Sequence, residues 1–228
     1  FLMENERMTE QEAAKQFLQT SGREKYFNTL KNELKRELIR YLMANPSWST
    51  KKHKVLIEDC YRNFAAYKIL LTLGKRKTAI ELATPLLSKL RSIDTYPLAY
   101  IVARDLRAHY ASSDPSPSLV KKYETIIAKY DAIIQAETLV HQYYDRVALI
   151  CNTRDGFTKD HLAYFKEAAE STLPLTRLGS STLNRFIYSM VIAHYHANRE
   201  YNTALDYCEQ ALSGIPEDHP NIQSLRFS

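Results

Sequence analysis

The chain has 228 residues, of which 45% are hydrophobic and 25% are charged, and its formal net charge is +5. This balance is ordinary for a folded globular protein and excludes a chain that is disordered throughout. No apolar run reaches the roughly 18 residues that a membrane-spanning helix needs, so no membrane partner is expected.

Glycine is rare, and its positions indicate the fold class. The five glycines all fall between segments with helical patterns: Gly22, Gly74, Gly156, Gly179 and Gly214. Many short strands joined by tight turns would need more glycine than this. The sequence therefore predicts an all-α protein in which glycine is used where helices stop.

The first 50 residues predict an N-terminal helical hairpin. A capping box at Thr9–Glu12, a hydroxyl followed three residues later by a carboxylate, opens a short helix over 9–19. A second helix begins near Arg23 and carries leucines and aromatic residues at spacings of three and four. It ends at Asn45, because the residue before a proline is disfavoured in the helical region.

Eight further helices are predicted after this hairpin, and they form about four pairs over residues 51–216. The predicted segments are 51–73, 75–90 and 96–111, then a serine- and proline-rich loop over 112–118, then 119–151, 158–171, 181–197 and 202–213. The segment 119–151 contains no glycine or proline but exceeds the usual length of a globular helix. It is therefore expected to form two antiparallel helices, with a turn near 135–138.

The last pair carries a recognisable residue pattern. Its first helix has Tyr188, then Val191–Ile192, then Tyr195, and its second helix has Ala204, Cys208 and Ala211 before Pro216. This pattern resembles the tetratricopeptide repeat, a helix–turn–helix unit of about 34 residues. The pair 55–90 matches in part, and the two middle pairs match only in helical length. General α-solenoids are the alternative.

The resemblance implies a fold and a mode of binding. The fold would be a right-handed α-solenoid of antiparallel helical hairpins, and a protein or peptide would bind in the concave groove lined by the first helix of each pair. In the best-matched pair, Ser189, Ala193 and His196 would line that groove. They are small or neutral and lack the lysine and asparagine with which family members clamp a carboxyl terminus, so that ligand class is not expected.

No catalytic, cofactor-binding or metal site is predicted. His194 and His196 lie two residues apart, which places them about 200° apart around a helix axis, so they cannot chelate one ion together. The sequence has no HExxH or CxxC motif and no glycine-rich phosphate loop. Its three cysteines, Cys60, Cys151 and Cys208, are far apart and odd in number, which favours a reducing, cytoplasmic location. An enzyme is therefore not expected.

Charge is the asymmetric feature of the chain. Residues 23–77 contain fourteen lysines or arginines against five acidic residues, a net charge of +9, so the remainder is acidic. This region is either a solvated basic face or a docking surface for an acidic partner. Its candidate partner-binding residues are Lys31, Lys35, Arg40, Trp48, Lys51, Lys52, Lys54, Lys75, Arg76 and Lys77.

The predicted function is that of a non-enzymatic scaffold which binds a protein or peptide, with no cofactor. The alternative is a nucleic-acid-binding or regulatory helical domain that uses the basic region 23–77. Residues 217–228 place Ile222 and Leu225 three apart, as at the start of a further helix. We therefore expect one helical-repeat domain over 1–228 that forms the N-terminal part of a longer repeat protein. The sequence leaves the partner's identity and the oligomeric state open.

Overall fold

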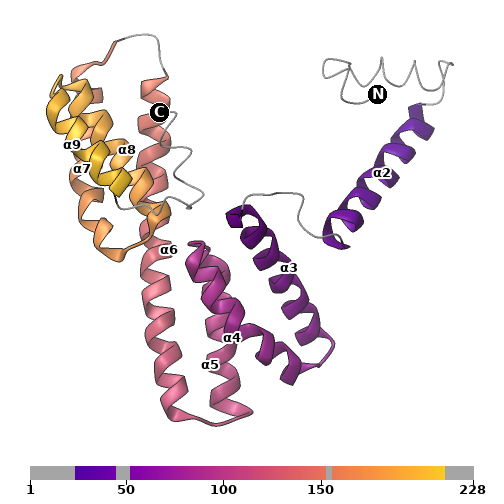
Figure 1. Cartoon of the computed structure of the whole chain (residues 1–228). Coiled ribbons are helices and arrows are strands. Elements are labelled where there is room, and N and C mark those ends of the chain that lie inside the picture. The colour runs from indigo at the N-terminus through magenta and orange to yellow at the C-terminus, as the bar shows by residue number, and fades with distance from the viewer. Residues whose placement is uncertain (1–23, 45–51, 153–155, 214–228) are drawn as a thin grey trace. The chain divides into compact units, whose positions relative to one another are not determined.

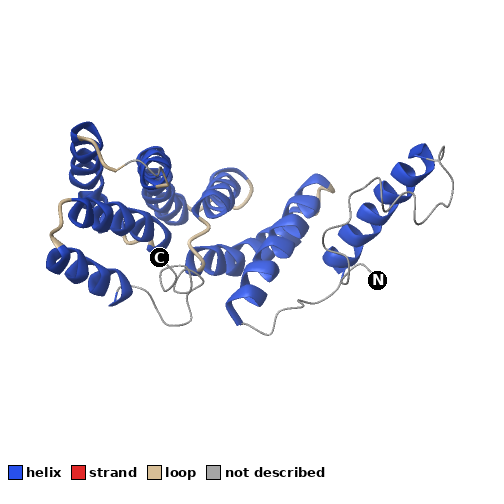
Figure 2. Cartoon of the chain, turned by 90° about the horizontal axis from the view of Figure 1, so that it is seen from above, coloured by secondary structure: helices blue, strands red, loops and turns tan. Residues whose placement is uncertain are grey.

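The structure is a computed structural model that describes residues 24–44, 52–152 and 156–213 (Figure 1). The described residues form helices and connecting loops and contain no strand, which confirms the all-α prediction (Figure 2). Contacts within the chain divide it into two compact units, Phe1–Trp48 and Ser49–Ser228. The two units are described separately below.

The first unit contains α2 (Glu24–Ala44), which confirms the helix predicted to begin near Arg23. Its apolar side chains recur every three or four residues, as expected, but they are exposed: Leu30, Leu34, Leu38 and Tyr41. The predicted capping box and the first helix of the hairpin lie outside the described residues, so the N-terminal hairpin stays a prediction.

The second unit contains seven α-helices and one short 3-10 helix among its described residues. They are α3 (Lys52–Thr72), α4 (Arg76–Ser92), α5 (Tyr96–Ser112), α6 (Pro117–Cys151), α7 (Lys159–Thr172), η1 (Leu173–Leu178), α8 (Ser181–Ala197) and α9 (Tyr201–Ser213). Each α-helix packs against the next one along the chain, and α6 also packs against α8. The short helix η1 was not predicted, and apart from α6 the boundaries of the other helices lie within two residues of their predictions.

The prediction of two helices over 119–151 was wrong. A single helix of 35 residues, α6, runs from Pro117 to Cys151 without a turn at 135–138. The reason is that its buried positions stay in helical register across the expected turn: Tyr123, Tyr130, Ile133, Ala136, Val140, Val147 and Ile150. A continuous apolar stripe with partners along its whole length stabilises an unusually long helix, and no residue interrupts it.

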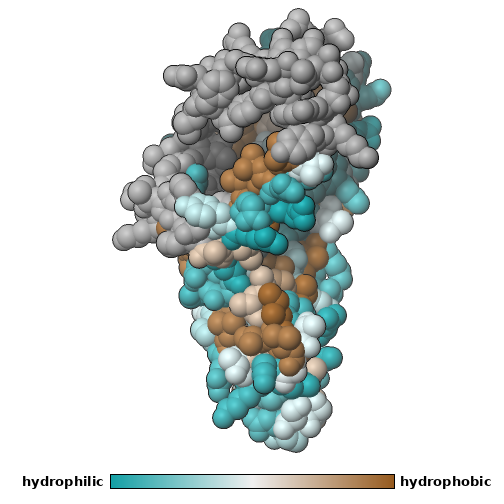
Figure 3. Space-filling view, turned by 90° about the vertical axis from the view of Figure 1, so that its right-hand side faces the viewer, coloured by the Kyte–Doolittle hydropathy of each residue, from teal (hydrophilic) through white to brown (hydrophobic). Residues whose placement is uncertain are grey.

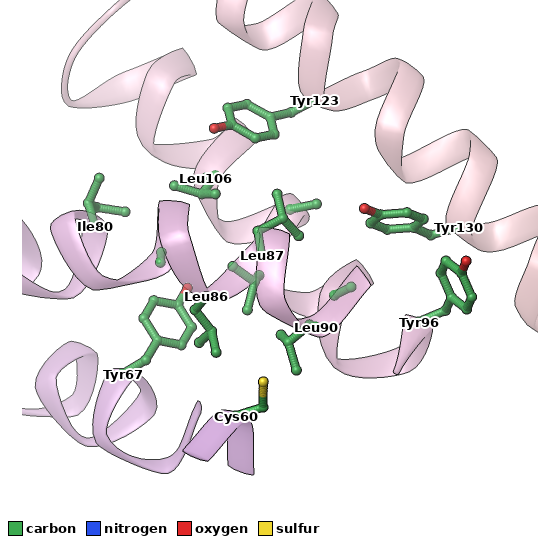
Figure 4. Close-up of a cluster of buried hydrophobic side chains, with 14 of the residues drawn as sticks. Cys60, Tyr67, Ile80, Leu86, Leu87, Leu90, Tyr96, Leu106, Tyr123 and Tyr130 are labelled. Atoms are coloured by element: carbon green, nitrogen blue, oxygen red, sulfur yellow. The ribbon is translucent and has the colours of Figure 1, made fainter. Parts of the chain in front are cut away.

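The buried side chains form two hydrophobic clusters, and α6 contributes to both. The first cluster lies between α3, α4, α5 and the first half of α6, and includes Tyr67, Leu86 and Leu106 (Figure 4). The second lies between the other half of α6, α7 and α8, and includes Phe165 and Ile187. Each half of α6 therefore belongs to one of the two cores, and the helix connects them.

A buried hydrogen-bond group ties the outer helix α3 to α5. The hydroxyl of Tyr67, which is fully buried, donates to the Asp105 carboxylate at 2.9 Å, and Lys68 approaches the same oxygen at 3.3 Å. Burial and this hydrogen bond both raise the pKa of Tyr67, so the phenol stays protonated and keeps donating at any physiological pH.

The turn between α4 and α5 reaches across the unit to the start of α8. Asp94 has a left-handed backbone (φ +54°), a conformation that aspartate tolerates better than most residues. One carboxylate oxygen accepts from the backbone N–H of Ser181 at 2.7 Å and of Thr182 at 3.1 Å, and the other accepts from the hydroxyl of Tyr96 at 3.0 Å. Together with Ser180, whose hydroxyl accepts from the Leu183 N–H, this carboxylate satisfies the first amides of α8.

Glu137, in the middle of α6, is the second carboxyl group at this junction. It is partly buried, and burial together with the nearby charge of Asp94 raises its pKa to about 7. The neutral acid is therefore the form that the folded state prefers at mildly acidic pH. The N-terminus of α8 stabilises the negative charge of Asp94. A second negative charge, on Glu137, is less favourable at this junction.

We predict that Asp94→Ala lowers the free energy of unfolding by about 2 kcal/mol, because it removes two charge-assisted caps and places alanine in a left-handed conformation. Asp94→Asn keeps a residue suited to that backbone but loses the charge, so its cost should be about 1 kcal/mol. Urea unfolding followed by circular dichroism measures both. Asp114→Ala, in the exposed α5–α6 loop, is the control. Equal values for Asp94→Ala and Asp114→Ala would refute the capping role.

Glu137 predicts a specific dependence of stability on pH. Because its folded-state pKa is raised above the unfolded value near 4.5, the folded state binds the extra proton, and stability is lost as pH rises from 4.5 through about 7. Glu137→Gln cannot ionise, so it should gain stability relative to the wild type by about 1 kcal/mol between pH 5 and pH 8, after allowing for solvent screening. Unfolding curves measured at both pH values test this, and parallel changes in the two proteins would contradict it.

Candidate functional site

The predicted basic residues are divided between the two units, and some of them lie outside the described residues. Lys31, Lys35 and Arg40 lie on α2 in the first unit, where Arg40 forms an exposed ion pair with Glu37 at 2.6 Å. Trp48 and Lys51 lie outside the described residues, as does the side chain of Lys52, the first residue of α3.

The remaining basic candidates lie at opposite ends of α3. Lys54 is exposed in its first turn, whereas Lys75, Arg76 and Lys77 are exposed at the turn that follows its last residue. A helix of 21 residues is about 30 Å long, so these two groups cannot contact one small ligand. These four basic candidates therefore do not form one site.

Of the three candidates on α8, only His196 is exposed. The hydroxyl of Ser189 donates to the backbone oxygen of Arg185 at 2.9 Å, and Ala193 packs against the second hydrophobic cluster. The ring of His196 meets the ring of Tyr201 edge-on, with centroids 5.5 Å apart. Ser189 and Ala193 are therefore partly buried in contacts within the unit, and His196 contacts α9.

The α8–α9 hairpin packs as its sequence pattern predicts. Ala204 and Ala211 are buried, and Tyr195 turns into the interface, where its ring stacks on that of Tyr207 with centroids 5.4 Å apart and planes 12° apart. Tyr188 contacts the same ring. Tyr207 was not singled out from the sequence, although its position three residues after Ala204 and four before Ala211 places it on the same helix face.

His194 and His196 contact different neighbours, in agreement with their angular separation. The ring of His194 packs against that of Tyr195 at 4.9 Å between centroids, and burial lowers the pKa of this histidine. Across the described part of the chain, no three His, Cys, Asp or Glu side chains come together as a potential metal site.

The second unit contains a groove between α4 and the first half of α6, which the sequence did not reveal. Its volume is about 240 Å³, and we call it the α4–α6 groove. It is lined by Thr84, Leu87, Ser88 and Arg91 from α4 and by Lys122, Tyr123, Ile126 and Tyr130 from α6. In Figure 4, Tyr123 and Tyr130 extend from α6 toward the side of the groove where Leu87 lies.

The two helices run in the same direction along this groove. Thr84 hydrogen-bonds to Tyr123 at one end, and Arg91 lies near Tyr130 at the other. Lys122 lies beside Tyr123, with its ammonium 5.8 Å from the ring centroid. The two cations therefore mark opposite ends of the groove, with Leu87 and Ile126 between them.

The lining residues suit binding better than catalysis. Burial raises the pKa of both Tyr123 and Tyr130, so their phenols remain neutral. The lining contains no Asp, Glu, His or Cys side chain that could act as an acid, a base or a nucleophile. Arg91 and Lys122 are exposed, and neither forms an ion pair with a described carboxylate. The groove can therefore hold anionic groups that flank an apolar one.

No protein-family model matches the chain, and neither the curated proteins nor the solved structures include a significant match to it.

The packing of the α8–α9 hairpin predicts the effect of enlarging its small residues. Ala204→Leu or Ala211→Leu should lower the free energy of unfolding by about 1 to 3 kcal/mol, because each adds three carbons where the two helices are in close contact. His196→Ala, on the exposed side of α8, should change it by less than about 0.5 kcal/mol. Urea unfolding of the three variants gives the comparison. Tolerance of both leucines would show that the hairpin does not depend on close approach at these positions.

Proposed function

We propose that the protein is a non-enzymatic scaffold whose helices form a tetratricopeptide-like, right-handed α-solenoid and bind a protein or peptide partner. Two features support the architecture: α3 to α6 and α7 to α9 pack successively along the chain, and the α8–α9 interface has the small and aromatic residues of the repeat pattern. Such arrays act by presenting extended surfaces to other proteins.

The observation that carries this proposal is the row of exposed apolar residues on α3 and the turn that follows it. Tyr61 and Ile69 on α3, and Leu73 directly after its last residue, are each more than half exposed, and their spacing in multiples of four places them along one face. Figure 3 shows hydrophobic areas among hydrophilic ones on the described part of one face of the molecule. A contiguous exposed apolar face is typical of a surface that binds another protein.

The other end helix of the described array has the same property. On α9, Tyr201 and Leu205 are more than half exposed and lie one turn apart, and Leu212 continues their face two turns later. Exposed apolar faces on both outer helices fit a protein whose role is to be built into a larger assembly.

The nucleic-acid alternative has less support. Binding to a phosphate backbone uses many lysine and arginine contacts along one surface. The predicted basic candidates of the second unit that the structure describes, Lys54 and Lys75 to Lys77, are instead divided between the two ends of α3. A cytoplasmic location stays part of the proposal; none of the described helices is long and apolar enough to cross a membrane.

Affinity capture from the native host tests the proposal. The wild-type protein should enrich a specific protein that is lost from the variant Tyr61→Ser, Ile69→Ser, Leu73→Ser, because this variant removes the apolar face while leaving the buried side of α3 intact. Purified partner and scaffold should then bind with a Kd that rises at least tenfold in the variant, about 1.4 kcal/mol.

Leu149→Ser is the matched control, because Leu149 is 68% exposed near the end of α6. It should retain the partner, and both variants should keep the wild-type circular dichroism spectrum. A partner set that is the same for the wild type and the α3 variant would refute the role of this surface.

A further inference from the structure

We propose that the α4–α6 groove binds a short acidic segment of a protein partner, in which two acidic residues three positions apart flank an apolar residue. The inference rests on the proposed scaffold function and names the chemistry of one ligand. It follows from the charge, the spacing and the apolar centre of the groove.

The charges of the groove call for anionic groups. Arg91 and Lys122 are its only charged lining residues, both positive, and neither is paired with a described carboxylate. Ser88 and Thr84 add hydroxyl groups beside them. An arginine and a lysine next to hydroxyl donors bind a carboxylate through charge-assisted hydrogen bonds.

The spacing of the two cations sets the spacing of the acidic groups. Lys122 lies at the Thr84 end and Arg91 seven residues further along α4, a rise of about 10 Å. One carboxylate cannot bridge that distance. In an extended polyproline II segment, side chains three residues apart project on the same side and are about 9 Å apart. Two acidic residues at positions i and i+3 therefore match the groove.

The centre of the groove calls for an apolar side chain between the two acidic ones. Leu87 and Ile126 face this region from the two helices, and the buried rings of Tyr123 and Tyr130 border it. A volume of about 240 Å³ suits one or two side chains and is smaller than the usual small-molecule pocket of about 300 Å³ or more.

The same features disfavour a nucleic acid as the ligand. The rings of Tyr123 and Tyr130 are each only 4% exposed, so their faces are not available for stacking on bases. Two cations also supply far fewer contacts than the row of phosphates on a strand can use. The peptide is therefore the ligand class that the groove fits.

Selection from a displayed library of random 12-residue peptides tests the inference with the full chain. We expect the selected peptides to be enriched in pairs of Asp or Glu three positions apart with Leu, Ile or Val between them. In fluorescence anisotropy with synthetic copies, Arg91→Gln or Lys122→Gln should each weaken binding several-fold, and the double variant about tenfold or more.

Lys129→Gln is the matched control, because Lys129 is exposed on the same helix but does not line the groove, and it should leave the affinity unchanged within twofold. Moving the second acidic residue of a selected peptide by one position should weaken binding as much as Arg91→Gln does. A single-stranded oligonucleotide of equal charge should bind at least tenfold more weakly than the peptide.

The outcomes separate this inference from the scaffold proposal. Selected peptides that bind the double groove variant as well as the wild type would overturn the groove assignment but leave the scaffold function in place. An oligonucleotide that competes on equal terms with the peptides would overturn the ligand class. If no peptide is selected, the groove inference is overturned, and the α3 capture experiment decides the scaffold function alone.

Discussion

The second unit depends on one constraint, the unbroken register of α6. Its buried residues stay on one stripe from Tyr123 to Ile150, so one half of the helix completes the core with α4 and α5 while the other half completes the core with α7 and α8. A turn in the middle would release the two cores from each other. The α4–α6 groove also exists because Tyr123, Ile126 and Tyr130 are held in a straight line along α4.

Electrostatic contacts add to the link that α6 makes between the two cores. The carboxylate of Asp94, in the turn after α4, accepts hydrogen bonds from the first amides of α8. The two cores are therefore joined through charge-assisted hydrogen bonds as well as through the helix between them. The carboxyl group of Glu137 lies beside this contact. Its pKa is raised because burial and the neighbouring charge of Asp94 both oppose its ionisation. Two carboxyl groups can lie this close together where the surrounding structure fixes both of them in position.

Local signals in the sequence predicted local structure well, and failed where structure depends on distant partners. Gly74 marks a helix boundary that the structure reproduces, and the alanines of α9 predict a close interface that is present. The length of α6 was misjudged because typical helix lengths outweighed an uninterrupted pattern. Asp94 contacts Ser181, which lies 87 residues away, and no local sequence pattern predicts this contact. The same holds for the groove that α4 forms with α6.

A shared central helix has a consequence for how the molecule comes apart. In a simple repeat array each unit contacts only its neighbours, so the ends can fray while the middle stays folded. Here, loss of either core strips half of α6 of its partners and leaves an apolar stripe in water, at a cost of about 1.5 to 3 kcal/mol for each large side chain uncovered. We therefore expect the two halves to unfold in one cooperative transition. Under proteolysis or a pulling force, the described helices from α4 to α8 should then unfold together and not as separate repeats.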